Sequence, residues 1–340
     1  MAKKPREYSR KDKLRAIHHF VPQSYLRRFA IEGKPAQIYA YEIDKEPYAT
    51  NIKNVAGQRD LYTFKDTGDK GETAELEDVF ADIDGQGAEL LQLLDTMPDG
   101  FVELPEEQKG NLFSYIAFLH TRNVQERKQW AESFGQMSLV HMQMIASHEE
   151  VFHRDAKAAL GDKYEYKKAE ESREALLEGK MKVVYDPMDQ YFLGTTLAMS
   201  KELYFVLMRL KKAVLVSTET TSKHFVTSDN PVTHYAPEND NRPKWMGLGY
   251  VNAVFQLPIS PTRCLLLIND DMRMRTFKCT RDEVDHMNWY TYYYADRWIF
   301  SHIKSKTITQ MFKDHKAKVP FSKIDSPFGR AEKRTENEKS

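Results

Sequence analysis

Apolar residues follow a two-residue period near the start of the chain and a helical period after it. Gln37 to Ile43 alternates aromatic and aliphatic residues with others, which is typical of a strand. Asp60 to Phe64 predicts a second strand. From Thr73 onwards apolar side chains recur at helical spacing until the Met97-Pro98-Asp99-Gly100 turn, so we expect one long helix there.

The middle of the chain is predicted to be helical almost throughout. Residues 105–160 contain hardly any Gly or Pro, and Gly110 and Gly135 are the expected interruptions. Residues 165–180 are highly charged and fit a solvated helix or a linker. Residues 189–211 carry an apolar face and predict a further helix.

The pattern changes again after Lys212, where short apolar runs alternate with turn residues. Four runs predict strands: 213–217, 224–227, 253–257 and 264–268. A final helix is expected from Arg281 to about Ser301. A group of helices followed by a group of strands indicates an α+β fold, with a helical middle and a mostly antiparallel C-terminal sheet.

Composition excludes several classes of protein. The 340-residue chain has 50 Lys+Arg and 50 Asp+Glu, so no global charge attracts it to nucleic acid or to an anionic membrane. A basic excess is confined to residues 1–15, which we expect to form a partly ordered arm, and residues 319–340 are predicted to be a disordered polar tail. No apolar run approaches the roughly 20 residues of a membrane span.

Cysteine usage and the N-terminus indicate a reducing compartment. Cys264 and Cys279 are the only cysteines, and neither belongs to a C-x-x-C pair. A disulfide framework and an all-cysteine zinc site are therefore excluded. The basic N-terminal residues are not followed by the apolar stretch of a secretory signal. The sequence predicts a soluble cytoplasmic protein.

The segment from His18 to Phe29, His-His-Phe-Val-Pro-Gln-Ser-Tyr-Leu-Arg-Arg-Phe, holds the densest set of reactive side chains. Neighbouring residues of an extended chain point to opposite sides, so one histidine is expected to face a given site. We favour His19, because Pro22 and the short helix after it fix its surroundings. A neutral imidazole there would bind a metal or accept a proton, and the alternative is a structural histidine bonded to a backbone carbonyl.

Carboxylates on the first long helix are further candidates. Glu77 and Asp84 are seven residues, or two turns, apart, so both project from one face. Half-buried carboxylates require partners, and a purely structural interpretation is salt bridges to Arg27, Arg28 or Arg122.

The segment His120-Thr121-Arg122-Asn123 lies on a later helix. His120 falls on the apolar face of that helix and is expected to be buried and hydrogen-bonded. Arg122 points elsewhere, and a guanidinium near a helix core needs a carboxylate or a phosphate.

Thr227-Ser228-Asp229-Asn230-Pro231 is the second distinctive segment. Asp and Asn stabilise such turns by bonding to nearby backbone groups, so a structural turn is one interpretation. The other is that a strand-end turn delivers Asp229 to a site, with Ser228 and Asn230 beside it. No G-x-S-x-G context supports Ser228 as a nucleophile.

Familiar site motifs are absent or incomplete. There is no Walker loop, G-x-G-x-x-G or H-E-x-x-H. His-His-Phe-Val-Pro is similar to the first histidine motif of His-Asn-His nucleases, but the next histidine after His19 is His120, so the rest of that motif is missing. The aromatic run from Trp289 to Tyr294 is a candidate surface for stacking bases, although an amphipathic helix burying large aromatics explains it equally well.

Together these segments resemble the bacterial family catalogued as Domain of Unknown Function 4238. His19 to Phe29 matches its His-(aromatic)-Val-Pro-Gln-x-Tyr-Leu-Arg-x-Phe opening, and Thr227 to Pro231 matches its Thr-Ser-Asp-Asn-Pro turn in full. Asn288 to Ser301 resembles its closing helix. Asp84 departs from the pattern, since glutamate is usual there. The resemblance implies no established activity and a single domain, residues 16–318.

The resemblance also groups seven positions that match the family pattern: His19, Gln23, Arg27, Glu77, Asp84, Arg122 and Asp229. A set of histidine, carboxylates, arginine and amide without cysteine has the makeup of a hydrolase or phosphoryl-group site.

We therefore hypothesise a nuclease-like hydrolase acting on a phosphate-containing substrate, either nucleic acid or nucleotide. The candidates for binding a divalent metal, or for serving as acid and base, are His19, Glu77, Asp84 and Asp229. The candidate binding residues are Gln23, Arg27, Arg122, Ser228 and Asn230. The alternative is a non-enzymatic sensing or effector protein, in bacterial defence or a mobile element, whose ionic network is structural.

Overall fold

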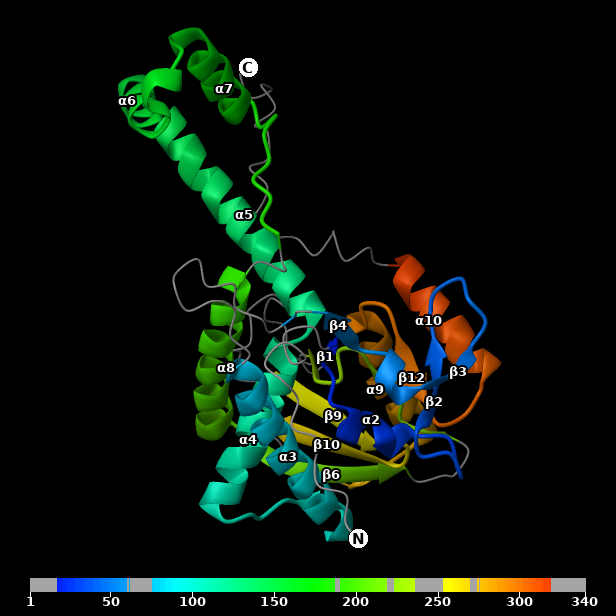
Figure 1. The fold of residues 1–340 in the computed structure, drawn as a ribbon. Coiled ribbons are helices and arrows are strands. Elements are labelled where there is room, and N and C mark those ends of the chain that lie inside the picture. The colour runs from blue at the N-terminus through cyan, green and yellow to red at the C-terminus, as the bar shows by residue number, and fades with distance from the viewer. Residues whose placement is uncertain are drawn as a thin grey trace, which may run out of the picture. The chain divides into compact units, whose positions relative to one another are not determined.

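The computed structural model describes residues 17–59, 61, 75–186, 190–218, 223–235, 253–269, 274 and 276–318 (Figure 1). Contacts divide the chain into two compact units. The first unit consists of Met1–Gln125 and Leu193–Ser340, and the second is Glu126–Phe192. The sequence predicts one domain over residues 16–318, and we describe the two units within that range separately. The predicted arm and tail lie outside the described residues.

Strands of the first unit form three sheets among the described residues. The largest has the order β11 (Lys278–Cys279), β6 (Lys212–Thr218), β10 (Arg263–Ile268), β9 (Val254–Ser260) and β8 (Thr233–Tyr235), and β5 (Gly100–Phe101) also pairs with β6. All of these pairs are antiparallel except β11 with β6. The predicted α+β class and its mostly antiparallel C-terminal sheet are thus confirmed.

Both faces of this sheet are buried. Val214 and Val216 of β6 share one face with Cys264 of β10, and Val284 and Met287 of α9 (Arg281–Tyr294) pack there. The alternate residues of β6 and β10 are buried as well. A sheet covered on both sides needs continuous apolar strands, which explains the unbroken runs in the sequence.

A second sheet brings distant parts of the sequence together. Its order is β3 (Tyr48–Asn51), β2 (Gln37–Tyr41), β12 (Ile299–Ser301) and β7 (Thr227–Ser228). Strand β12 lies between β2 and β7 and pairs with both, so it joins the N-terminal region to the strand that opens the Thr-Ser-Asp-Asn-Pro turn. The third sheet is β1 (Ile17–His19) paired with β4 (Gly57–Arg59).

Helices of the first unit pack beside these sheets (Figure 1). They are α2 (Gln23–Leu26), α3 (Glu75–Thr96), α4 (Glu106–Thr121), α8 (Gln190–Leu210, its first residues belonging to the second unit) and α10 (Lys306–Lys318), with short turns η1 (Arg27–Phe29) and η2 (Ile52–Asn54). Helices α3 and α4 lie side by side. A Cβ atom at Gly87 would lie 2.2 Å from the Tyr115 ring, so glycine permits this close contact.

The second unit is helical among its described residues. It contains α5 (Val124–Ala146, from Glu126), α6 (Glu149–Leu160), the turn η3 (Gly161–Lys163) and α7 (Tyr166–Leu177). Gly110 and Gly135 do not interrupt the helices, so that prediction is wrong. Gly135 instead serves close packing, because a Cβ atom there would lie 2.4 Å from the carbonyl oxygen of Val183.

Two further predictions need correction. The final helix α9 ends at Tyr294, and Ile299–Ser301 form a strand instead. Most of the predicted strand 224–227 is not a strand, because the side-chain amide of Asn288 accepts from the Val226 N–H (3.0 Å) and donates to the His224 carbonyl (2.9 Å), in place of a neighbouring strand. Of the predicted strand 60–64 only Leu61 is described, and it lies in a turn.

None of the helices in the described part of the chain has the length and apolar character that crossing a membrane requires.

Candidate functional site

The opening motif and the Thr-Ser-Asp-Asn-Pro turn are in direct contact. The buried Tyr25 hydroxyl donates to the Pro258 carbonyl (2.6 Å) and lies 2.7 Å from the Thr227 hydroxyl, with which it shares a second hydrogen bond. Tyr25 belongs to α2, which begins after Pro22 and buries Tyr25 and Leu26. The two end motifs of the sequence therefore pack as one structure, although 202 residues separate Tyr25 from Thr227.

The same turn is bonded to the segment at the end of α4. Asn123 donates to the side-chain oxygen of Asn230 (3.1 Å), and Asn230 in turn donates to the Tyr294 carbonyl (3.4 Å). His120 is fully buried and its Nδ1 donates to the Val232 carbonyl (3.2 Å), as expected for a structural histidine. Asn230 is thus a buried link between α4 and α9.

Asp84 and Arg122 form a bidentate ion pair. Arg122 Nη1 and Nη2 donate to the two Asp84 oxygens at 3.1 and 2.8 Å. The Arg122 side chain has no exposed surface, whereas that of Asp84 is 23% exposed. The guanidinium also lies over the Phe118 ring, 5.0 Å from its centroid. Arg122 is one of the three arginines that the sequence offered as salt-bridge partners for the carboxylates of α3. The pair with Asp84 matches the interpretation of this carboxylate as structural.

His19 lies close enough to this pair for the charge of Arg122 to act on it. Its Nδ1 lies 3.1 Å from the Val55 carbonyl, which only accepts, so Nδ1 carries the hydrogen. Burial lowers the His19 pKa, and the neighbouring His18 and Arg122 charges lower it further, while hydrogen bonds to the Val55 and Ala56 backbone act in the opposite sense. A neutral ring with hydrogen on Nδ1 has its lone pair on Nε2, the form that accepts a proton or binds a metal.

Gly57 determines where the His19 ring lies. Strands β1 and β4 pair His19 with Gly57. A Cβ atom at position 57 would lie 2.9 Å from His19 Nδ1 and 2.7 Å from Ile17 Cγ2. Glycine at position 57 therefore leaves space for the His19 ring in its observed position. Nothing in the sequence around Gly57 indicated this role.

Asp229 is engaged by backbone groups. Its two oxygens accept from the N–H groups of Asp296 (2.9 Å), Arg297 (2.7 Å) and Trp298 (3.0 Å). Burial raises the Asp229 pKa to about 6, and repulsion from Asp296 adds to this, while the three backbone bonds act in the opposite sense. The geometry gives Asp229 a structural task, holding the turn that ends α9. Its catalytic or metal-binding role remains a prediction.

The other predicted residues are scattered. Ser228 donates to the Asn230 carbonyl (2.8 Å) and accepts from its N–H (3.0 Å), so its hydroxyl is used within the turn. Gln23 is half-buried and Arg27 is exposed. Arg28, not Arg27, forms the ion pair, with Asp95 at 2.6 Å. The side chain of Glu77 lies outside the described residues.

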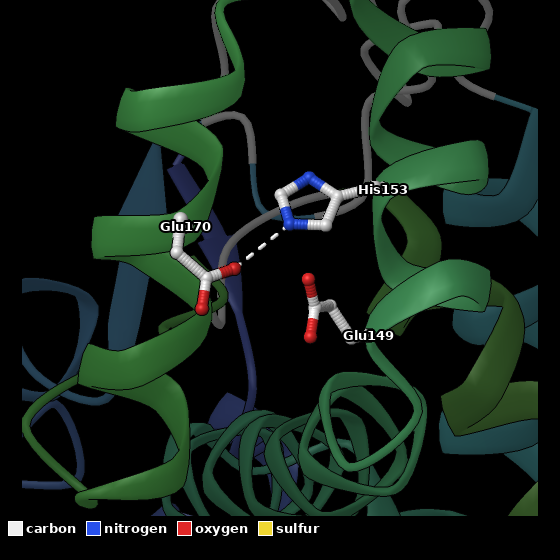
Figure 2. Close-up of side chains that lie close together, drawn as sticks. All are labelled: Glu149, His153 and Glu170. Atoms are coloured by element: carbon white, nitrogen blue, oxygen red, sulfur yellow. Dashed lines mark hydrogen bonds and ion pairs between the residues drawn. The ribbon is translucent and has the colours of Figure 1, made fainter.

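Potential metal ligands converge elsewhere. In the described part of the chain, His19, Asp84 and Asp229 form no group whose ligand atoms lie within 4.8 Å of one another. Glu149, His153 and Glu170 of the second unit do form such a group (Figure 2). Sequence reasoning missed it, although Glu149 and His153 lie one helical turn apart and that spacing was the available signal.

Comparison with curated proteins and with solved structures found no significant match. The family model described as Protein of unknown function (DUF4238) matches residues 17–305. This range begins at β1 and ends just after β12, so it includes every segment of the network around Tyr25, Arg122 and Asp229. Because the match covers most of the chain, the protein belongs to the DUF4238 family.

Proposed function

We propose that the protein is a hydrolase acting on a phosphate-containing substrate, nucleic acid or nucleotide, with His19 as its central base. The observation that supports this most is the geometry of His19, whose Nδ1 donates to the Val55 carbonyl (3.1 Å) and so leaves the lone pair on Nε2. A ring that is neutral at physiological pH, with its lone pair on Nε2, is ready to remove a proton from an attacking water. It is also ready to coordinate a divalent metal, which is the candidate cofactor.

In this proposal Asp84 is the acidic partner and Arg122 holds it in place. Arg122 is fully buried and both of its terminal nitrogens donate to Asp84, so it is suited to orienting that carboxylate. The partly exposed Asp84 would share a metal with His19 or orient the water. The exposed Arg27 is the residue left to bind a phosphate group.

Asp229, Ser228 and Asn230 take a supporting role. Their side chains are occupied in bonds that shape the turn, so they would keep Thr227 against Tyr25 and Asn230 against Asn123. The proposal places the protein in the cytoplasm, where its two buried cysteines stay reduced.

The test is a substrate screen with purified protein. RNA, single- and double-stranded DNA, nucleoside triphosphates and a chromogenic phosphodiester are assayed with and without Mg²⁺, Mn²⁺ or Zn²⁺. We expect His19→Ala to lower kcat by about 10²–10⁴-fold, the usual contribution of a general base. Arg27→Ala should mainly raise KM.

His141→Ala is the matched control, because His141 is an exposed histidine of the second unit. Full activity in the control and none in His19→Ala, with both folded, would support the proposal. No activity on any substrate, or activity that survives His19→Ala, would overturn it.

A second candidate is a non-enzymatic sensing or effector protein. The complete burial of Arg122 favours it, since a guanidinium held inside the fold by Asp84 has no surface to offer a substrate. Here His19→Ala would lower stability sharply and no substrate would be turned over. Thermal unfolding of the variants, run beside the activity screen, separates the two candidates.

A further inference from the structure

We propose that the second unit binds one divalent transition metal ion, best Zn²⁺, between Glu149, His153 and Glu170. The proposal is independent of the function proposed above, because all three residues belong to the second unit and none of them belongs to the His19 site. Figure 2 shows Glu149 and His153 on one helix and Glu170 on the facing helix, with the imidazole and both carboxylates turned toward a common space.

The positions of the ligand atoms come close to a coordination shell. One atom from each residue can be chosen so that all three lie within 4.8 Å of one another, and His153 Nε2 is 2.8 Å from Glu170 Oε2. Zinc bonds to imidazole nitrogen and carboxylate oxygen are about 2.0–2.2 Å long, which places ligand atoms of a tetrahedral site about 3.4 Å apart. Glu149 is exposed and is the first residue of α6, so its side chain has room to rotate toward the other two ligands.

Each of the three ligands has its own outer partner. The Tyr164 hydroxyl bonds His153 Nδ1 (2.8 Å), and the Tyr166 hydroxyl donates to Glu149 Oε1 (2.9 Å). The Tyr166 ring also stacks on the imidazole, at 4.2 Å between centroids. Metal-bound histidines and carboxylates are typically held in this way, since the outer hydrogen bond fixes the ring orientation and the tautomer.

Arg173 is the outer partner of Glu170. It donates to both carboxylate oxygens, with its shortest bond, 2.7 Å, from Nη2 to Oε1, and it is anchored by a bond from Nη1 to the Ala146 carbonyl (3.0 Å). A carboxylate has about four acceptor positions, so Oε2 keeps one that faces His153. Arg173 therefore orients Glu170 without blocking the proposed site.

His153 Nε2 and Glu170 Oε2 lie 2.8 Å apart, so a hydrogen on Nε2 joins them unless a metal ion takes its place. When the Tyr164 hydroxyl accepts from Nδ1, the lone pair of Nε2 is directed at Glu170 and can bind a metal ion. The two carboxylates outnumber the one Arg173 guanidinium, and the negative charge that is left favours a cation between them. Three protein ligands leave a fourth position for water, the arrangement of zinc sites that carry out chemistry.

Zinc titration of the full chain tests the proposal. The protein is stripped with a chelator, and Zn²⁺ is then added in a calorimeter, with metal content measured after desalting. We expect one Zn²⁺ per chain at this site, and Kd raised at least 100-fold by His153→Ala and by Glu170→Gln. Co²⁺ in place of Zn²⁺ should give the visible absorption of a four-coordinate ion, absent in both variants.

Matched controls are the exposed neighbours His141→Ala and Glu150→Gln, which should bind zinc like the parent protein. His19→Ala should also leave this binding event unchanged, which separates it from any metal at the His19 site. Glu149→Gln removes a ligand from an exposed position, so it weakens zinc binding without affecting helix content, even where His153→Ala alters folding. The proposal is overturned when the parent binds no zinc, or when the controls lose as much affinity as the ligand variants.

Discussion

Two clusters of similar chemistry in this protein differ in burial and in how their residues are joined. In the first unit Arg122 pairs with Asp84, and the guanidinium has no exposed surface. In the second unit Arg173 pairs with Glu170, and their side chains are 17% and 24% exposed. Asp84 and Arg122 are 38 residues apart in the sequence, so their pair joins α3 to the end of α4. Glu170 and Arg173 lie one turn apart on the same helix, α7.

This difference in burial indicates which cluster stabilises the fold and which one is accessible to a ligand. A buried charge that loses its partner costs about 3–5 kcal/mol, because water does not replace the lost bonds. An exposed pair contributes about 0–1 kcal/mol, since water competes for both charges. We therefore expect the Arg122 cluster to determine stability and the Glu170 cluster to be free to bind a ligand.

The largest effect is expected for Asp84→Ala. This substitution removes the two Asp84 oxygens that accept from the fully buried guanidinium at 3.1 and 2.8 Å, so the free energy of unfolding should fall by about 3–5 kcal/mol. Urea unfolding followed by circular dichroism measures it. A loss below about 1 kcal/mol would mean that solvent reaches Arg122, and the contrast between the two clusters would fail.

The next effect concerns Asp229 and pH. Its pKa is raised from 3.8 to about 6 in the folded protein, so between these values the folded state holds a proton that the unfolded chain has released. Stability from this group is therefore complete below about pH 4 and is lost as pH rises through about 6, by about 3 kcal/mol.

Comparison of the parent with Asp229→Asn over pH 4 to 7 isolates this contribution. The asparagine does not titrate, so the difference in unfolding free energy between the two proteins should change in favour of the variant as pH rises. A difference that is constant with pH would contradict the raised pKa. A lower stability of the variant at all pH values is expected in addition, since the amide leaves one of the three backbone N–H groups without its acceptor.

A smaller effect is expected for Gly57→Ala. The added methyl group would overlap His19 and Ile17 and should cost about 1–3 kcal/mol of stability. It should also push the imidazole outwards, so that the His19 pKa rises toward its ordinary value as burial is lost. NMR titration of the His19 ring in parent and variant measures the change. An unshifted pKa would show that Gly57 does not position the ring.

The smallest effect on stability is expected for Glu170→Gln, because Glu170 and its partners are partly exposed and water competes for their charges. The same substitution should abolish most of the zinc affinity. A large loss of stability would identify the Glu170 cluster as a structural ion network. The contrast with the Arg122 cluster would then fail.

Local patterns predicted most elements of this fold. The helices from residue 106 to residue 177 and the strands β6, β9 and β10 follow from helical spacing and from continuous apolar runs. Errors occurred where a distant side chain completed the backbone bonding. Asn288 replaces a strand partner for Val226, and Asp229 binds the N–H groups that follow α9. Neither contact can be inferred from residues nearby in the sequence.

For the candidate site, the sequence proposed the residues, and the structure adds the contacts that they make. The two end motifs were recognised as a pair, and they meet through Tyr25 and Thr227. Arg122 was assigned to anion binding, yet its geometry favours holding Asp84. Arg28 pairs with Asp95, whereas the predicted role of Arg27 in binding an anion stays a prediction.

By itself the sequence determined the α+β class, the order of most helices and strands, and membership of a family, because these depend on side-chain periodicity and on short motifs. Only the tertiary structure decided which polar groups are satisfied and which are free to react. Burial and bonding partners set the pKa of His19, occupy the carboxylate of Asp229 and gather Glu149, His153 and Glu170. The first two of these properties arise between residues far apart in the chain, where sequence periodicity carries no information. The third is partly visible in the one-turn spacing of Glu149 and His153, but the facing Glu170 is placed only by the fold.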